Sequence, residues 1–172
     1  MVLFRPLCCY TAVEVQESIT KLGLTGFGVG VSKLYLAGLS YVDRDRVAVL
    51  GWSHGGMSTL EAVQGSHQGG PFRAAIAFYP YCKPMSKINA PLLVLIGEKD
   101  DWTPAYRCEK FILPEENEQE IVLKVYPDAY HSFDQPFSLR TYRGHKLGRN
   151  SSAASDAYDR VRAFLEKYLI DH

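Results

Sequence analysis

One serine in this sequence stands in a pattern typical of a catalytic nucleophile. Residues 51–55 read Gly-Trp-Ser-His-Gly, with Ser53 at the centre. A strand-like apolar run, 46–50, precedes them, and a helix-like stretch, 56–64, follows. On such a sharp strand-to-helix turn the serine hydroxyl stands clear of the sheet, and the backbone N–H of His54 is directed at a developing oxyanion. The pattern therefore predicts a nucleophile elbow carried by Ser53.

Glycines have two different expected roles in this chain. Gly51 and Gly55 are expected to permit the elbow, because side chains at these positions would collide with the neighbouring strand and helix. The glycine-rich stretch 26–30 lacks the third glycine and the preceding strand of a dinucleotide-binding fingerprint, and it also lacks the Gly-Lys-Ser/Thr of a Walker-type loop. We therefore expect 26–30 to form a flexible turn between two helices.

A serine hydroxyl needs a base to take its proton and an acid to orient that base, and on this kind of fold the chain order is Ser, Asp or Glu, then His. The strand-like run 92–96 leads into Asp100 and Asp101. We assign Asp100 as the acid; Asp101 is the alternative, and its other role would be to cap the following helix. His131 comes just after the last strand-like run, 121–126, where the general base belongs.

Further candidates surround these three residues. His54, Trp52 and Trp102 are the expected oxyanion and substrate-binding residues. Asp134 either supports the loop of His131 or faces solvent. The basic cluster within 140–149 is expected to be a solvated part of a long surface loop, since most such runs are.

Apolar and helical patterns indicate an α/β fold in a single domain, 1–172. The strand-like runs lack strict alternation, as strands buried on both faces of a parallel sheet do. Helix-like stretches separate them, which predicts a mostly parallel sheet flanked by helices. Before residue 45 the chain is expected to be mainly helical, at 12–22 and 31–41, with at most a strand stub at 2–4. The strand-like runs are 46–50, 74–79, 92–96 and 121–126, and the helix-like stretches are 56–64, 104–113 and 156–169.

Composition excludes several classes of function. The 172 residues are 47% apolar and 22% charged, and 19 basic residues balance 19 acidic ones, so no net charge draws in nucleic acid or an anionic membrane. No run approaches the roughly 20 apolar residues of a membrane span. The N-terminus lacks the pattern of a signal peptide, so a cytoplasmic location is the default expectation.

The cysteines show no metal-ligand spacing, and we expect neither a metal nor a cofactor. Cys8 and Cys9 are adjacent, which rules out a standard zinc pair. Cys82 and Cys108 stand near the ends of predicted elements. Their positions allow a disulfide, and two buried free thiols are an equally good interpretation.

The motifs together resemble the dienelactone hydrolase family of the α/β-hydrolase fold. The matching segments cover roughly residues 31–172. The resemblance implies that Ser53, Asp100 and His131 form a catalytic triad acting on a small carboxylic ester or lactone through an acyl-enzyme. The segments that carry it are 41–47, 51–56, 78–80, 95–104 and 126–134, with 153–169 similar to the family's closing helix.

The chain departs from the family in two respects. The founding dienelactone hydrolases have cysteine as the nucleophile, whereas this chain has Ser53, which favours a broader ester or lactone substrate. The family's first strands and the loop that supplies the second oxyanion N–H have no counterpart in the sequence, which suggests an N-terminally truncated, C-terminal catalytic portion. We then expect an exposed sheet edge at 46–50. The alternative function is a weakly active or inactive chain that acts by binding, or by pairing with another copy through that edge.

Overall fold

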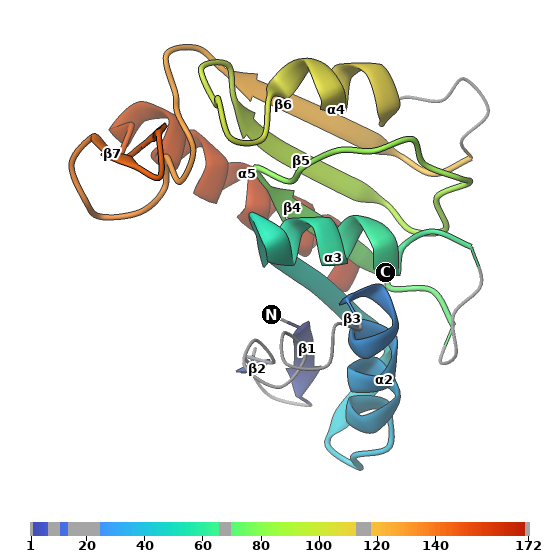
Figure 1. The fold of residues 1–172 in the computed structure, drawn as a ribbon. Helices are drawn as coiled ribbons and strands as arrows, with labels where there is room; N and C mark the ends of the chain where they lie inside the picture. The colour runs from blue at the N-terminus through green and yellow to red at the C-terminus, as the bar shows by residue number, and fades with distance from the viewer. Residues whose placement is uncertain (1, 7–10, 14–24, 66–69, 113–117, 171–172) are drawn as a thin grey trace.

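A six-stranded sheet forms the centre of the molecule (Figure 1). The computed structural model describes residues 2–6, 11–13, 25–65, 70–112 and 118–170. Strands β3 to β6 are mutually parallel, and β1 pairs antiparallel with both β3 and β2. Every residue of β4 and β5 is buried, which accounts for the absence of alternation in the sequence. In spatial order the strands are β2 Thr11–Val13, β1 Val2–Pro6, β3 Val42–Trp52, β4 Ala74–Phe78, β5 Leu92–Gly97 and β6 Ile121–Tyr126.

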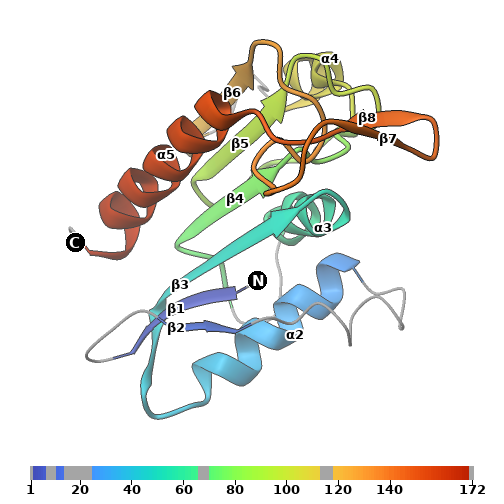
Figure 2. The ribbon, with the colours of Figure 1, turned by 90° about the vertical axis from the view of Figure 1, so that its left-hand side faces the viewer.

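Helices cover both faces of this sheet (Figure 2). Helix α5 (Ser151–Leu169) packs on one face against β3, β4 and β5. Helix α3 (His54–Ala62) and helix α4 (Ala105–Phe111) lie on the other face, and α2 (Thr25–Ala37) packs beside α3. The prediction of a mostly parallel α/β sheet flanked by helices is confirmed. None of the helices in the described ranges is long and apolar enough to cross a membrane.

The N-terminal part differs from the sequence prediction in its strands. The stub expected at 2–4 is a full strand, β1, and residues 12–13 belong to β2 instead of a helix; the remainder of that predicted helix, 14–22, lies outside the described residues. Strand β1 aligns Val2 with Val49 and Phe4 with Val47. The exposed edge predicted at 46–50 is therefore wrong, because β1 supplies the backbone partners of β3. Pairing between copies through that edge loses its basis.

The glycine-rich stretch 26–30 is helical and does not form a turn. It lies within α2, which ends at Ala37 and not at residue 41. Val29, Lys33 and Leu36 are all buried and recur at helical spacing on one face of α2. Glycine destabilises a helix by about 1 kcal/mol per residue, and burial of this face outweighs that cost. The local sequence pattern does not report this burial.

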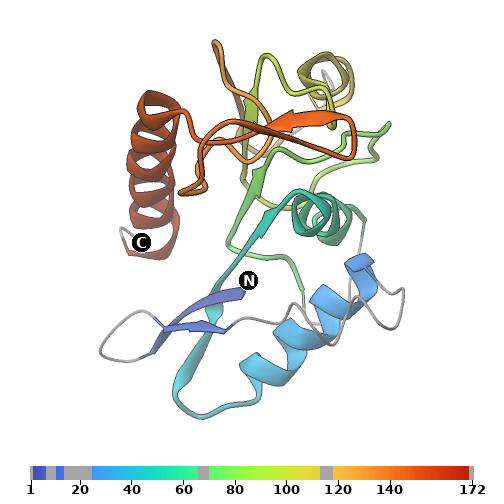
Figure 3. The ribbon, with the colours of Figure 1, turned by 60° about the vertical axis from the view of Figure 1, so that its left-hand side comes forward.

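The polar region from 135 to 155 is more regular than a long loop. Two short strands, β7 (Arg140–Tyr142) and β8 (His145–Leu147), form an antiparallel hairpin. Figure 3 shows this hairpin at the end of the sheet toward which β3, β4 and β5 point. Helix α5 begins at Ser151, earlier than predicted, because the Asn150 side chain accepts a hydrogen bond from the backbone N–H of Ala153 at 3.1 Å and caps the first turn.

Cys82 and Cys108 form a disulfide, and both are fully buried. Cys82 lies beyond the end of β4, and Cys108 is in α4. The bridge therefore joins the segment after β4 to the helix that follows the segment of Asp100. Cys8 and Cys9 lie outside the described residues.

Candidate active site

Ser53 stands on a strained turn between β3 and α3. Its backbone has φ 52° and ψ −114°, in the left-handed half of the map that non-glycine residues seldom occupy. Two hydrogen bonds hold the turn: the Ser53 N–H donates to Phe78 O at 2.9 Å, and Met57 N–H donates to Ser53 O at 3.0 Å. A strained serine held in this way is the geometry expected of a nucleophile elbow.

Two glycines make the turn sterically feasible, and one of them differs from the prediction. A Cβ at Gly51 would lie 2.1 Å from Gly55 O, and a Cβ at Gly56 would lie 2.9 Å from Phe78 O. At Gly55 a Cβ would meet nothing within 4 Å, so the predicted clash at this position is wrong. The close approach is made by the Gly55 carbonyl, and it constrains Gly51 instead.

The three residues expected to do chemistry lie together. His131 Nε2 is 3.0 Å from Ser53 Oγ, and His131 Nδ1 is 2.8 Å from Asp100 Oδ2. The side chains of His131 and Asp100 are 4% and 0% exposed, whereas Ser53 is half-buried at the surface of the site. A buried carboxylate that accepts a hydrogen bond from Nδ1–H holds the imidazole with Nε2 free to take a proton from the serine.

Asp100 is held by the backbone and by a residue that sequence analysis missed. Its Oδ1 accepts from Trp102 N–H at 2.9 Å and from Thr103 N–H at 2.8 Å. The Thr103 hydroxyl lies 2.9 Å from Asp100 Oδ2, 3.1 Å from Tyr79 O and 3.2 Å from His131 Nδ1. Thr103 therefore joins the acid to the segment after β4. A threonine three residues after the acid was the only available sequence signal.

Asp101 has neither of the roles considered for it. Its side chain is 48% exposed and accepts from Lys146 N–H at 3.2 Å, with His145 Nδ1 at 3.5 Å. It does not face His131. It also does not cap α4, whose N-cap is Pro104 without a side-chain hydrogen bond.

The residues predicted to line the site occupy different positions around it. His54 is exposed and is the first residue of α3, where backbone N–H groups lack intrahelical partners. Trp102 lies 5.3 Å from His131 between ring centroids and stacks on His145 at 4.9 Å. The indole N–H of Trp52 points elsewhere and donates to Asp134 Oδ2 at 3.0 Å.

Asp134 is buried, with 2% exposure, so the solvent-facing interpretation is wrong. Besides Trp52, its carboxylate accepts from the Tyr79 hydroxyl at 2.8 Å and from Gln135 Nε2 at 3.2 Å. Burial raises the pKa of the Tyr79 phenol, and the charge of Asp134 raises it further. The phenol thus stays protonated and remains a donor.

The basic cluster borders the site on the β7–β8 hairpin. The Arg140 and Arg143 side chains are exposed and lie over the rings of Phe137 and Tyr142. Arg149 is exposed as expected, and its guanidinium also donates to Asp134 O at 3.1 Å.

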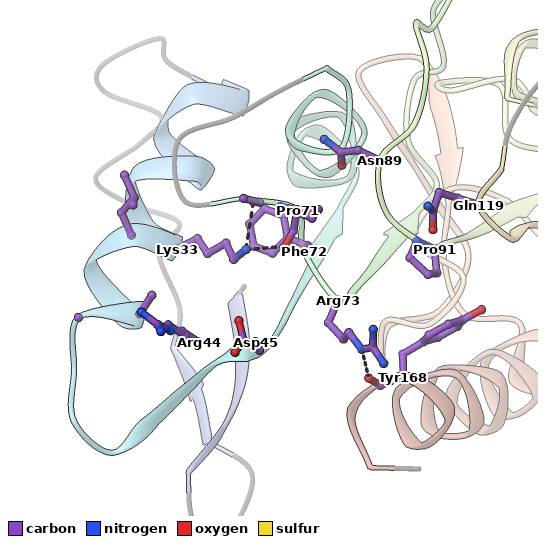
Figure 4. Close-up of a pocket in the computed structure, with 14 residues that line it drawn as sticks. Lys33, Arg44, Asp45, Pro71, Phe72, Arg73, Asn89, Pro91, Gln119 and Tyr168 are labelled. Carbon is purple, nitrogen blue, oxygen red and sulfur yellow. Dashed lines mark hydrogen bonds between the residues drawn. The ribbon is translucent and has the colours of Figure 1, made fainter. Parts of the chain in front are cut away.

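A pocket of about 840 Å³ lies at the opposite edge of the sheet, near the amino ends of the strands (Figure 4). Lys33 is buried beside it and donates to Gly70 O at 3.0 Å and Pro71 O at 2.5 Å. Arg73 donates to Tyr168 O at 3.1 Å. The pocket contains none of the residues predicted to do chemistry. Within the described ranges, no group of three or more His, Cys, Asp and Glu side chains is arranged to hold a metal ion.

The sequence model of the dienelactone hydrolase family matches residues 29–169, which is most of the chain. The chain belongs to the dienelactone hydrolase family. Its fold is accordingly an α/β-hydrolase fold.

The proteins similar to this chain carry different names. The chain is 29% identical over 140 residues to a platelet-activating factor acetylhydrolase of Cavia porcellus, covering 74% of this chain and 31% of that protein. The solved structure m3DLH superposes with a TM-score of 0.71 at 19% identity, covering 89% of this chain and 65% of that one. A dienelactone hydrolase-like promiscuous phosphotriesterase from metagenomic libraries has a TM-score of 0.70 at 19% identity, covering 90% and 65%. The chain thus spans less than two thirds of each of these relatives.

Proposed function

We propose that this chain is a serine hydrolase that cleaves a carboxylic ester or lactone through an acyl-enzyme. The observation that carries the proposal is the hydrogen-bonded series Ser53 Oγ, His131 Nε2, His131 Nδ1 and Asp100 Oδ2, at 3.0 and 2.8 Å. Membership of a hydrolase family supports the reaction class, and the description of one relative as an acetylhydrolase supports an ester substrate.

In the proposed mechanism Ser53 Oγ attacks the carbonyl carbon while His131 Nε2 takes the serine proton. Asp100 stabilises the resulting imidazolium and keeps its orientation. The oxyanion receives a hydrogen bond from the backbone N–H of His54 at the start of α3. His131 then returns the proton to the leaving alcohol, which stays attached to the acyl group when the substrate is a lactone. Water activated by His131 hydrolyses the acyl-enzyme and frees Ser53.

Trp102 is the proposed side wall of the substrate site. Its ring lies beside that of His131 and stacks on that of His145 in the β7–β8 hairpin. The proposal needs neither a metal nor a cofactor. Trp52 is an indirect contributor in this scheme, since its polar atom is directed at Asp134.

The test is hydrolysis of p-nitrophenyl acetate by the wild-type chain and by Ser53→Ala. We expect the substitution to lower kcat by at least about 10³-fold, as loss of a nucleophile does in serine hydrolases. Ser86→Ala is the matched control, since Ser86 is exposed and bonds only to Gln64 through its side chain. A fluorophosphonate probe should label the wild type and the control but not the Ser53 variant. Equal rates for all three proteins would contradict the proposal and favour the alternative, an inactive chain that acts by binding.

A further inference from the structure

Asp134 is a buried carboxylate that the proposed mechanism does not use. A buried carboxylate is costly unless donors satisfy its oxygens. Here Oδ1 accepts from the Tyr79 hydroxyl at 2.8 Å, and Oδ2 accepts from Trp52 Nε1 at 3.0 Å and Gln135 Nε2 at 3.2 Å. Two of these donors come from residues 82 and 55 positions away in the chain. The carboxylate is thus a junction between separate segments.

The segments that meet at Asp134 are those that bear the proposed triad. Trp52 ends β3 and directly precedes Ser53. Tyr79 follows β4, and its carbonyl lies 3.1 Å from the Thr103 hydroxyl that contacts Asp100. Asp134 itself is in the turn that begins at His131. One carboxylate therefore links the nucleophile, the support of the acid and the loop of the base.

Tyr79 also contacts His131, the proposed base, directly. Its ring centroid lies 4.6 Å from that of His131, and its backbone has φ 36°, which is unfavourable for a non-glycine residue. The hydroxyl bond to Asp134 fixes the ring from its far end. Loss of that bond removes one restraint on the tilt of the ring against the imidazole.

We propose that Asp134 is a positioning residue that sets the distance and angle between Ser53 Oγ and His131 Nε2. This inference rests on the proposed function. A displacement of about 1 Å at a reacting group can cost about 10² in rate, so a clamp on both sides of a 3.0 Å contact affects turnover directly. The side chain acts on Trp52 and Tyr79, while the Asp134 backbone carbonyl is held separately.

That separation makes the proposal testable in folded protein. The Asp134 carbonyl accepts from Arg149 at 3.1 Å and from the Tyr158 hydroxyl at 3.3 Å. These bonds do not depend on the carboxylate. Substitution of the side chain should therefore release the clamp while the loop remains anchored to Arg149, which lies between β8 and α5, and to Tyr158 of α5.

The experiment compares Asp134→Leu with Asp134→Asn in p-nitrophenyl acetate hydrolysis. Leucine removes both acceptors, whereas asparagine retains an acceptor for the Trp52 indole and its amide can donate to the Tyr79 oxygen. We expect D134L to lower kcat about 10²-fold with KM changed less than about threefold, and D134N to recover most of the loss. Asp128→Asn is the matched control; Asp128 is exposed, pairs with Lys99 at 2.5 Å, and should leave kcat unchanged.

A spectroscopic readout follows the clamp independently of turnover. The chain has two tryptophans, so an indole ¹⁵N–¹H spectrum contains two signals, and Trp52→Phe assigns them. D134L should shift the Trp52 signal upfield as the hydrogen bond is lost, and D134N should restore it. If D134L does not fold, Tyr79→Phe removes one donor and is expected to lower kcat about tenfold.

Three outcomes would overturn the inference. D134L could lose thermal stability yet keep its kcat, which would make Asp134 purely structural. It could raise KM alone, which would indicate substrate binding. D134N could fail to recover either kcat or the indole signal. If the wild type neither hydrolyses the ester nor labels at Ser53, the proposed function itself fails, a result that differs from an active wild type indifferent to D134L.

Discussion

The polar groups at the two ends of the parallel strands behave differently. We call the end where the strands finish the carboxyl edge and the end where they begin the amino edge. At the carboxyl ends of the strands, the side chains of Asp100, His131 and Asp134 are buried. Asp100 is hydrogen-bonded to His131, and Asp134 accepts a hydrogen bond from the Tyr79 hydroxyl. At the amino ends lies a pocket of about 840 Å³, and its buried Lys33 bonds to backbone carbonyls. This space is therefore away from the assembled titratable groups. In open α/β sheets sites lie at the carboxyl ends of the strands, which is where the candidate site of this chain lies.

The sharpest test of this comparison is a pair of adjacent aspartates at the carboxyl edge. Asp100→Asn should lower kcat for p-nitrophenyl acetate by about 10⁴-fold, because an amide in place of the carboxylate favours the wrong tautomer of His131. Asp101→Asn should change kcat by less than about threefold, since the Asp101 carboxylate is exposed and bonds to Lys146 and His145 of the hairpin. Comparable losses in both variants would contradict the assignment of the acid. Serine labelling by the fluorophosphonate probe measures the same difference without turnover.

A second prediction separates stability from chemistry at the same edge. The disulfide closes a loop between Cys82 and Cys108, 26 positions apart, which corresponds to about 3–4 kcal/mol of stability. The free energy of unfolding of the double variant Cys82→Ser/Cys108→Ser, measured by urea denaturation, should be lower by that amount. Its kcat should fall much less than that of D100N, because neither sulfur contacts the triad. Dithiothreitol should destabilise the wild type and leave the double variant unchanged; an equal effect on both proteins would show that the bridge is not responsible.

The contrast between the edges also explains what the sequence could predict. That Ser53, Asp100 and His131 lie together was predictable because each follows a strand-like run and a triad on this fold has a fixed chain order. The burial of Asp134 could not be predicted, since it depends on Trp52 and Tyr79 from distant segments. No local pattern reports such a partner.

The N-terminal errors have the same origin. Strand β1 was expected to be at most a stub because five residues carry little periodicity, yet pairing with β3 defines it. The glycines of 26–30 argue against a helix locally, but the face containing Val29 and Leu36 is buried by tertiary packing. In both places the deciding contacts are non-local.

At the amino edge, Lys33→Met should affect stability and not activity. It leaves the carbonyls of Gly70 and Pro71 without this donor, at a cost of about 1–3 kcal/mol. Turnover per folded molecule should equal that of the wild type. A loss of kcat in K33M with the fold intact would break the distinction between the edges.

The Lys33 prediction has a defined pH dependence. Burial lowers the pKa of Lys33, and the charge of Asp45 opposes this only in part. The unfolded chain then binds more protons than the folded one between the folded pKa and the ordinary value of 10.5. The stability of the wild type relative to K33M should therefore rise with pH across that interval. Urea unfolding of both proteins at pH 7 and pH 10 measures the change; a fall in relative stability would contradict the assigned burial.

The smallest effect is expected from Glu120, which directly precedes β6 on the amino edge. Its carboxylate accepts from Lys167 Nζ at 2.5 Å and from the Tyr168 hydroxyl, and the hydrogen bond from Lys167 is the main cause of its lowered pKa. A lowered pKa means that the stabilisation is present above the ordinary pKa of 4.5 and is lost as pH falls through the folded value.

Because this pair is exposed, solvent screening keeps its contribution small, and Glu120→Gln should lower Tm at pH 7 by less than about 3 °C. The difference from the wild type should be smaller at pH 3 than at pH 7, because Glu120 becomes protonated in the folded state as pH falls through its lowered pKa. Glu118→Gln is the control, because its pair with Lys87 is more exposed still. If E120Q differed from the wild type equally at both pH values, its effect would come from lost packing and not from charge. An exposed pair of this kind should therefore tolerate substitution with far less effect on turnover than the buried connections around Ser53.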